Sequence, residues 1–344
     1  MFTKQELLKI DKNFIYHKSL HLPEQVWLGY HKCKIQNFCK KTYKSKIDRV
    51  VICGMGGSAI GGYIAQAAFG EKLTIQIAND FSTPFIDEKT LLIFCSFSGN
   101  TDETICCFKT SAKKTKNIAI ITTGGRLLDL AKNSYPYVKI EKDKHPPRTS
   151  IAYQFFAIVR LLETLGLIQN QKKVVQRLTW QLSCKANALC YKSENNLADI
   201  SAKKIVGKIP VIYSTSPQLF PAAYRLKCQF NENANYPAFA LTLPEALHND
   251  IQSFGSPLQE KMLPIIFSSF VEEKNSELQR DKILSLIGKR DFLEFSAEGE
   301  TTIERIFSLV YLGDMISYYL AIALKTDPTP IGLIEKSKLF DRSI

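Results

Sequence analysis

The stretch Arg49-Val-Val-Ile-Cys-Gly-Met-Gly-Gly-Ser-Ala-Ile-Gly-Gly62 joins an apolar run to a glycine-rich turn and then to an apolar segment with small residues. The run predicts a buried strand over Val50–Cys53, and the segment near Ala59–Ala68 predicts a helix. A glycine turn that leads from a strand into a helix exposes backbone N–H groups, and an anion can approach them closely. The stretch therefore predicts a bound phosphate or other anion, although glycine turns that only shape a connection are common.

The first half of the chain alternates short apolar runs with helical patterns. Such alternation predicts a parallel sheet with helices on both faces, and ligands bind these sheets beyond the carboxyl ends of the strands. The further predicted strands are Leu73–Ala78, Leu91–Cys95, Ile118–Thr122 and Tyr137–Ile140, with a second helix over Asp102–Lys113.

A second set of strand patterns follows a lysine-rich helical connection that runs to about Lys204. Its strands are predicted at Pro210–Tyr213, Pro264–Phe267 and Phe292–Phe295, and helical sequence runs from Ile303 to Lys325. The sequence thus predicts an α/β protein of two lobes, each a mainly parallel sheet flanked by helices. We place the first domain, with an N-terminal helical extension, at residues 1–165. The connecting helices, the second domain and a C-terminal helix occupy residues 166–344.

The chain has 344 residues and a net charge of +12, but its lysines are spread thinly and no basic stripe is interleaved with aromatic residues. This distribution favours a solvated surface over a nucleic-acid-binding face. No apolar run looks long enough to span a membrane, and the N-terminus lacks the apolar core of a signal peptide. We therefore expect a cytoplasmic protein without nucleic-acid or membrane partners.

The nine cysteines include no CxxC pair, and the chain has only five histidines. Cys53 and Cys95 fall inside apolar strand patterns, where a cysteine serves as a small hydrophobic residue. This usage favours reduced structural thiols over disulfides or a zinc site. We expect no metal ion and no organic cofactor.

A second motif, Phe94-Cys-Ser-Phe-Ser-Gly-Asn-Thr-Asp-Glu-Thr104, places the hydroxyls of Ser96, Ser98 and Thr101 in a strand-to-helix loop. Hydroxyls and backbone N–H groups at the start of a helix can hold the oxygens of a phosphomonoester without a metal. The alternative is helix capping by Ser98 or Thr101. Capping accounts for one hydroxyl and leaves two unexplained.

Two shorter motifs complete the first half. Ile121-Thr-Thr-Gly-Gly125 ends the fourth predicted strand and by itself indicates only a turn. Pro146-Pro-Arg148 fixes an arginine behind two prolines, which suits a guanidinium that must face a developing negative charge. Without further context, a surface arginine explains the last motif equally well.

These motifs, in this order, resemble the sugar isomerase (SIS) domain and, more closely, the bifunctional phosphoglucose/phosphomannose isomerase family. The resemblance covers about residues 47–338 and rests on the GMGGS turn, the SxSGNT loop, the TxGG turn and the PPR segment. In the second half, Ala223–Ala234 resembles the family's AYRxKxxxNEN segment, Leu243–Ile251 its PExxHN segment, and Asp327–Lys338 its DPTPxxxIxxxK ending.

The resemblance implies an aldose–ketose isomerase with two SIS-type lobes. It would interconvert glucose 6-phosphate, mannose 6-phosphate or both with fructose 6-phosphate through a cis-enediolate. Glu232 would be the base that moves a proton between C1 and C2, a step that a well-placed carboxylate can perform. Arg148 would stabilise the enediolate, and His248 and Lys338 would open the sugar ring, a task that suits a histidine. The residues implied in substrate binding are Gly56, Gly57, Ser58, Ser96, Ser98 and Thr101.

The resemblance further implies a homodimer in which His248 reaches the active site of the partner subunit. The main alternative is a non-catalytic sugar-phosphate sensor, which would usually carry a helix-turn-helix module that the first 46 residues do not resemble. An amino-sugar enzyme would need a glutamine-hydrolysing domain. A nicotinamide-dependent oxidoreductase is disfavoured because Gly54, Gly56 and Gly57 do not follow GxGxxG.

The sequence departs from the family pattern at three places. Tyr63 stands where an acidic residue is usual, Asn235 replaces the lysine of NENAK, and Leu247 replaces the first asparagine of NHN. None of the three removes an implied catalytic group. They leave the choice between the two aldose phosphates open, and Thr329 is a candidate contact for that choice.

Overall fold

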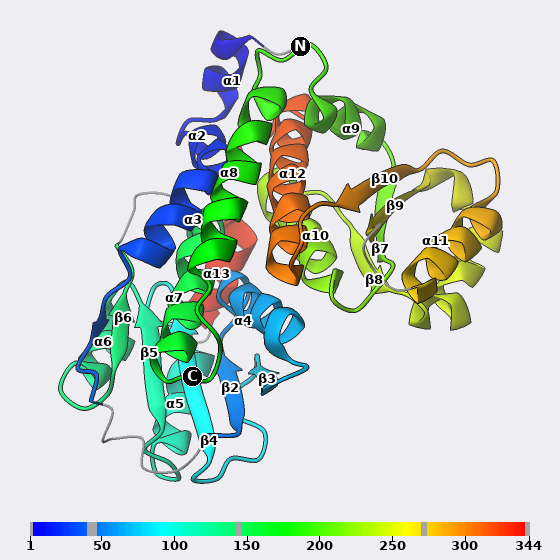
Figure 1. Ribbon diagram of the computed structural model, residues 1–344. Coiled ribbons are helices and arrows are strands. Elements are labelled where there is room, and N and C mark those ends of the chain that lie inside the picture. Colours follow the sequence, from blue (N-terminus) through cyan, green and yellow to red (C-terminus); the bar gives the residue numbers. More distant parts are fainter. Residues whose placement is uncertain (1–2, 40–46, 142–145, 270–273, 341–344) are drawn as a thin grey trace. The chain divides into compact units, whose positions relative to one another are not determined.

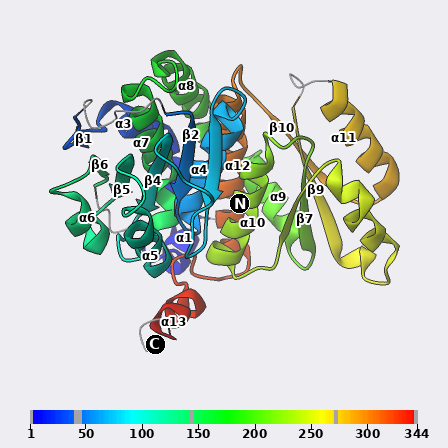
Figure 2. The ribbon, with the colours of Figure 1, turned by 90° about the horizontal axis from the view of Figure 1, so that it is seen from below.

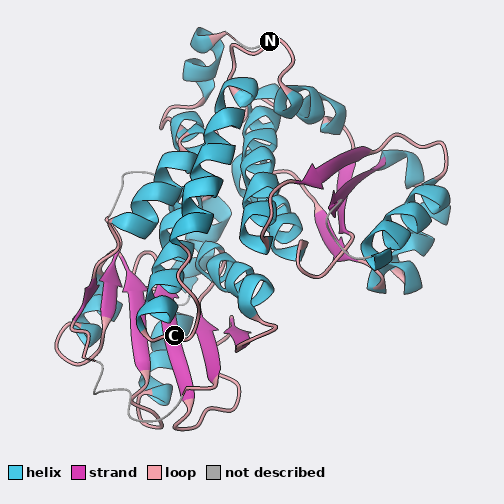
Figure 3. Cartoon of the chain, in the orientation of Figure 1, coloured by secondary structure: helices cyan, strands magenta, loops and turns pink. Residues whose placement is uncertain are grey.

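The computed structural model describes residues 3–39, 47–141, 146–269 and 274–340, and its chain forms two compact units (Figures 1 and 3). Glu24–Thr179 forms one, called here the larger-sheet unit. Met1–Pro23 and Trp180–Ile344 together form the other, the smaller-sheet unit. This grouping assigns residues 1–23 and 166–179 differently from the predicted domain division at residue 165, which stays a prediction.

The larger-sheet unit contains, within its described residues, a sheet of six strands in the order β1-β6-β5-β4-β2-β3. All neighbouring strands are parallel except the short edge strand β1, which runs antiparallel to β6. The five strands predicted in this half are confirmed, whereas β1 has too few residues to give a sequence pattern. The strands are β1 (Ile35–Gln36), β2 (Arg49–Cys53), β3 (Thr74–Ala78), β4 (Thr90–Ser96), β5 (Ile118–Thr122) and β6 (Tyr137–Lys139).

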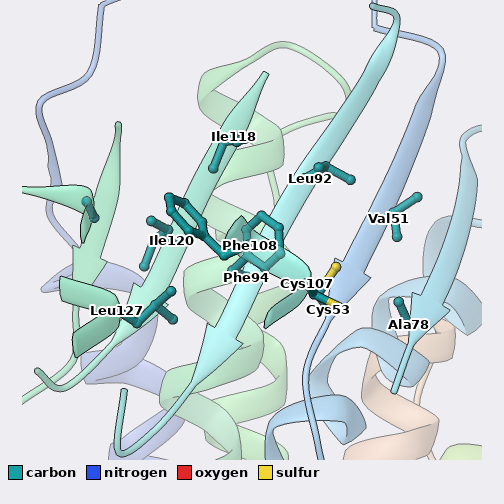
Figure 4. Packing of buried hydrophobic residues seen from close by; sticks show 11 residues of the cluster. Val51, Cys53, Ala78, Leu92, Phe94, Cys107, Phe108, Ile118, Ile120 and Leu127 are labelled. Carbon is teal, nitrogen blue, oxygen red and sulfur yellow. The ribbon is translucent and has the colours of Figure 1, made fainter. Parts of the chain in front are cut away.

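One face of this sheet packs against α5 (Asp102–Ser111) and α6 (Gly125–Ala131). Strand residues two apart point to the same face, so Leu92 and Phe94 of β4 join Ile118 and Ile120 of β5 in one apolar cluster (Figure 4). The ring of Phe108 from α5 meets the ring of Phe94 edge to face, with their centroids 5.3 Å apart. This core holds β4 and β5 in place. The loops that follow the carboxyl ends of these two strands are therefore held in place as well.

The opposite face is associated with α4 (Gly57–Phe69) and α7 (Ile151–Thr164), which follow α3 (Leu22–His31) in the chain. Small residues bring α4 close to its neighbours: a β-carbon on Gly62 would lie 2.8 Å from Ile77 Cδ1, and one on Gly61 would lie 3.3 Å from Ile158 Cδ1. Helices on both faces make this sheet the doubly covered parallel type that the sequence predicts.

The smaller-sheet unit contains, within the part of it that is described, four parallel strands in the order β10-β9-β7-β8. The three strands predicted here are confirmed, while the partly buried strand β8 was not predicted. Figure 2 shows α11 on one side of this sheet and α10 and α12 on the other. The elements are β7 (Ile209–Ser214), β8 (Phe239–Thr242), β9 (Met262–Ser269), β10 (Leu293–Ala297), α8 (Lys172–Leu189, which begins in the larger-sheet unit), α9 (Leu197–Ile205), α10 (Phe220–Ala234), α11 (Lys274–Ile287), α12 (Thr302–Ala323) and α13 (Gly332–Phe340).

The N-terminal segment packs inside the smaller-sheet unit through α1 (Lys4–Ile10) and α2 (Ile15–Leu20). The Tyr311 hydroxyl of α12 donates to the carbonyl of Leu20 at 2.8 Å, and Tyr191 N donates to the Tyr16 hydroxyl at 3.1 Å. Asp11 accepts hydrogen bonds from the backbone N–H groups of Ile15 and Tyr16, both at 2.9 Å, at the start of α2. The first helices are therefore part of this unit's core.

Helix α12 is the one described helix that is long and apolar enough to cross a membrane by length and composition, so the expectation that no apolar run reaches that length is wrong. Its most apolar window is 89% buried inside the protein. Helix α12 is therefore a core helix of this unit, and its burial explains its apolar composition. The expected cytoplasmic location stays a prediction.

Candidate active site

The glycine turn lies at the carboxyl end of β2, where Gly57 begins α4. Gly56 has φ of 50°, a conformation that favours glycine. A β-carbon on Gly54 would lie 2.9 Å from the carbonyl oxygen of Cys95, so the turn sits directly against β4. Ser58 is 8% exposed, and its hydroxyl accepts a hydrogen bond from Phe97 N at 3.3 Å. The turn and the loop after β4 are thereby joined.

The loop after β4 carries three hydroxyls in different settings. The hydroxyls of Ser96 and Thr101 share a hydrogen bond of 2.9 Å, and Gly99 N donates to Ser96 Oγ at 3.1 Å. Ser98 is exposed, and its hydroxyl accepts from Asn100 N at 3.2 Å. Thr101 is the N-cap residue of α5, but its side chain makes no capping hydrogen bond. Capping by Thr101 therefore does not explain its hydroxyl.

The turn after β5 touches the same loop. The Thr123 hydroxyl donates to the carbonyl of Phe97 at 2.6 Å, and Arg126 N donates to the side chain of Asn100 at 3.1 Å. A β-carbon on Gly125 would lie 2.5 Å from the carbonyl oxygen of Ser98, which only glycine avoids. We call Gly54–Ser58, Ser96–Thr101 and Thr122–Gly125 together the loop cluster.

Arg148 lies beside the loop cluster. A β-carbon on Gly57 would be 3.8 Å from the Arg148 Cα atom, and the Arg148 residue is only 3% exposed. Thr149 holds the segment in place, because its backbone N–H and its hydroxyl donate to the carbonyl of Pro146 at 3.0 and 2.9 Å. The larger-sheet unit thus brings the six predicted binding residues and Arg148 to one end of its sheet, with backbone N–H groups, hydroxyls and a guanidinium.

The predicted residues of the second half lie on three elements of the smaller-sheet unit. Glu232 is half-buried in the last turn of α10, so the Asn-Glu-Asn triplet is helical. His248 is exposed at the end of the 3₁₀ helix η3 (Glu245–His248), and Lys338 is exposed on α13. The Glu245 carboxylate accepts from the Asn249 side chain at 3.0 Å. Convergence of these three residues on one substrate stays a prediction.

The comparison with known proteins decides the family. The chain is 33% identical over 342 residues to the bifunctional phosphoglucose/phosphomannose isomerase of Caldicellulosiruptor bescii, and the match covers 94% of this chain and 98% of that protein. The chain belongs to the bifunctional phosphoglucose/phosphomannose isomerase family. Residues 194–339 also match the model of the bacterial phospho-glucose isomerase C-terminal SIS domain. The protein is therefore an isomerase with two SIS-type sheets, and the non-catalytic sensor is disfavoured.

The chain is also similar to two proteins with other names, one in sequence and one in fold. The chain is 29% identical over 228 residues to the D-glucosamine-6-phosphate 4-epimerase of Sulfolobus acidocaldarius, which covers 64% of this chain and 69% of that protein. In fold, it matches the C-terminal domain of glucosamine-fructose-6-phosphate aminotransferase from Francisella tularensis with a TM-score of 0.70 and 16% identity. That match covers 93% of this chain and 98% of the other.

The three departures from the isomerase family's pattern have structural roles. Asn235 ends α10 in the left-handed conformation, with φ of 50° and ψ of 37°, which asparagine tolerates better than most side chains. Leu247 packs against the apolar cluster of the smaller sheet. The Tyr63 hydroxyl accepts from the Asn79 side chain at 3.2 Å. Asn235 therefore suits the backbone at the end of α10, Leu247 serves packing, and Tyr63 makes a hydrogen bond.

Two cavities of this isomerase lie elsewhere. One of about 930 Å³ is lined by residues of α3, β1, β6 and α7 and their flanks, and one of about 310 Å³ by residues of α8, β10 and α12 and their flanks. Neither has a predicted site residue in its lining. Among the described residues, no group of three or more His, Cys, Asp or Glu side chains is arranged to hold a metal ion.

Sequence reasoning missed Asp314 and Arg225, which form an ion pair between α12 and α10, about two turns before Glu232 on α10. A signal was present: Asp314 is the one charged residue in the long, mainly apolar segment Ile306–Ala323. A charge at such a position requires a buried partner.

Proposed function

We propose that the protein interconverts glucose 6-phosphate, mannose 6-phosphate or both with fructose 6-phosphate. The observation that carries the proposal is the loop cluster beside Arg148. Its backbone N–H groups and hydroxyls, at the start of α4 and α5, have the chemistry that a phosphomonoester dianion requires.

The substrate-binding role falls to the loop cluster. Gly56 and Gly57 would offer backbone N–H groups, and the exposed hydroxyl of Ser98 can turn toward a phosphate oxygen. Ser58, Ser96 and Thr101 are held by hydrogen bonds to the loop itself, which pre-orders their oxygens for binding. Replacing Ser98 by alanine should raise KM for the sugar phosphate more than it lowers kcat.

The proton-transfer role falls to Glu232. After ring opening, assisted by His248 and Lys338, the Glu232 carboxylate takes the proton from C2 of the aldose and returns it to C1, while the hydroxyl proton of O2 passes to O1. After both transfers the carboxylate is ionised again. Because C2 of the sugar is oxidised while C1 is reduced, no cofactor has to accept electrons. Arg148 would stabilise the negative charge on the enediolate oxygen. Acid–base help of this kind contributes about 10²–10⁴-fold to the rate.

A coupled assay that supplies fructose 6-phosphate and measures glucose 6-phosphate and mannose 6-phosphate separately tests the function. Formation of either aldose phosphate supports it, and the ratio of the two rates gives the preference. Absence of both products, with D-glucosamine 6-phosphate converted instead to its 4-epimer, would replace this proposal by the activity named for the Sulfolobus relative.

We further propose a homodimer in which His248 serves the partner's active site. In support, His248 is exposed on its own chain and lies at the end of a short 3₁₀ helix. Glu232→Gln and His248→Ala proteins, each inactive alone, should regain about a quarter of the wild-type activity when they are unfolded, mixed equally and refolded, because one site in each mixed dimer is intact. No regain in mixed dimers that are verified by mass would refute the exchange of His248.

A further inference from the structure

Helices α10 and α12 lie side by side in the smaller-sheet unit and share a buried ion pair (Figure 1). Arg225 Nε donates to Asp314 Oδ1 at 2.9 Å, and Arg225 Nη2 donates to Asp314 Oδ2 at 2.7 Å. Gln229 Nε2 adds a third hydrogen bond to Asp314 Oδ1 at 3.1 Å. The side chains of Arg225 and Asp314 are only 3% and 6% exposed, so water solvates their charges very little.

A second buried contact lies further along both helices, one turn past Asp314 on α12 and one turn past Gln229 on α10. The Asn233 side chain donates to Ser317 Oγ at 2.9 Å, and the Ser317 hydroxyl donates to the carbonyl of Asp314 at 2.8 Å. Gly313 allows the close approach, because a β-carbon there would lie 3.3 Å from Leu226 Cδ1. The contacts at Asp314 and at Ser317 thus join α10 to α12 at two successive turns of α12.

Polar contacts of this kind are a poor source of stability. Taking an arginine and a carboxylate out of water costs several kcal/mol per ion, and a well-packed apolar pair is often at least as stable. Directional contacts do fix one register and one rotation of a helix, which an apolar interface of leucines and alanines leaves looser. The α10–α12 contacts therefore serve orientation better than stability.

The residue that this orientation controls is Glu232. Gln229 lies one turn before it and Asn233 directly after it, so both contacts with α12 bracket its position on α10. The end of a helical side chain lies about 5 Å from the helix axis, so a rotation of about 10° moves it by about 1 Å. A misplacement of that size can cost about 10²-fold in rate.

We propose that Asp314 and Ser317 are positioning residues that set the rotation of α10 and thereby aim the Glu232 carboxylate at the substrate carbons. This inference rests on the proposed function, in which Glu232 is the base. Neither Asp314 nor Ser317 has to touch the substrate.

The chain offers a matched control for Ser317 on the same helix. Ser308 is 2% exposed and Ser317 is fully buried, and each hydroxyl donates to the carbonyl three residues earlier, at 2.7 Å for Ser308. Each also accepts one hydrogen bond, but the donor to Ser308 is the backbone N–H of Glu298 at 2.9 Å and not a side chain of α10. Ser317→Ala and Ser308→Ala thus remove similar hydrogen bonds, and only the first loosens α10.

Steady-state kinetics of wild type, Ser317→Ala, Ser308→Ala and Gln229→Leu test the inference. We expect Ser317→Ala and Gln229→Leu to lower kcat about tenfold with KM within about twofold, and Ser308→Ala to leave both unchanged. The binding stoichiometry for the sugar phosphate, measured by calorimetry, must stay at the wild-type value, which excludes a loss through unfolded protein.

The outcomes separate the two claims. An active wild type with equal kcat values for Ser317→Ala and Ser308→Ala would overturn the positioning role alone. A rise in KM without a fall in kcat would also overturn it, because a displaced base does not weaken phosphate binding. A wild-type protein that isomerises none of the three sugar phosphates would overturn the proposed function and this inference with it.

Discussion

Gly99 and Gly124 lie in such close contact that a β-carbon on Gly99 would overlap the carbonyl oxygen of Gly124. Gly99 also has φ of 67°, which disfavours any residue with a side chain. The contact joins the loop after β4 to the turn after β5, and both belong to the loop cluster proposed to hold the phosphate. It explains why glycine stands at position 99.

Gly99→Ala should therefore open the loop cluster. We expect KM for the sugar phosphate to rise at least about tenfold and the melting temperature to fall, because the methyl group must push the two loops apart. Gly166→Ala is the matched control, since Gly166 has φ of 73° with nothing within 4 Å of a new β-carbon. The control should cost only about 1 kcal/mol of stability and leave KM unchanged. Equal KM values for the two variants would contradict the proposed role of the loop cluster.

The Arg225–Asp314 pair makes a prediction about stability. Asp314→Ala should lower the free energy of unfolding by about 3–5 kcal/mol, because it leaves the Arg225 guanidinium buried without its carboxylate. The double variant Arg225→Met, Asp314→Leu should be more stable than Asp314→Ala, because no charge stays buried. Urea unfolding of these variants measures the difference. A double variant that is less stable than Asp314→Ala would show that the pair itself stabilises the fold.

The buried tyrosines of the smaller-sheet unit make a prediction about pH. Burial raises the pKa of Tyr16 to about 12, and burial also raises the pKa values of Tyr311, Tyr318 and Tyr319. A raised pKa means that the folded state keeps the proton more tightly, so the stabilisation is complete below pH 10 and is lost as the pH rises toward 12 and beyond.

The unit should therefore unfold in alkali. The phenolate absorbance of these buried tyrosines should appear together with the loss of helical circular dichroism. Tyr16→Phe should weaken this coupling, since it removes one titrating group and leaves the packing in place. Titration of all fourteen tyrosines near pH 10 with the fold intact would contradict the burial of this cluster.

The sequence predicts the sheets well, because β2, β4, β5 and β9 are buried apolar runs that need no tertiary information to be found. It also predicts the loop cluster. Glycines and hydroxyl residues that directly follow such strands lie at the carboxyl edge of the sheet, where parallel sheets bind ligands. Strand β8 was missed, because Phe239–Thr242 is only partly buried and lacks a continuous apolar pattern. The packing of Met1–Pro23 with residues of the C-terminal part was missed as well, since contacts such as Tyr311 with Leu20 join positions 291 residues apart.

The site residues of the second half of the chain could not be found from local sequence patterns. Glu232, His248 and Lys338 were found through a resemblance to a family, because a polar residue at the end of a helix has no pattern of its own. The partner of Arg225 could not be named from the sequence, as Asp314 lies 89 residues away on another helix. A single charge in a long apolar stretch shows that a buried partner exists but does not identify it.

The most direct test of the central claim is the conversion of fructose 6-phosphate in D2O by wild-type protein and by Glu232→Gln. The account predicts that the wild type forms an aldose 6-phosphate that carries deuterium at C2. Glu232→Gln should bind the sugar phosphate with nearly unchanged affinity, form less than about a hundredth as much product and incorporate no deuterium. Wild-type turnover and deuterium incorporation by Glu232→Gln would contradict the assignment of Glu232 as the base.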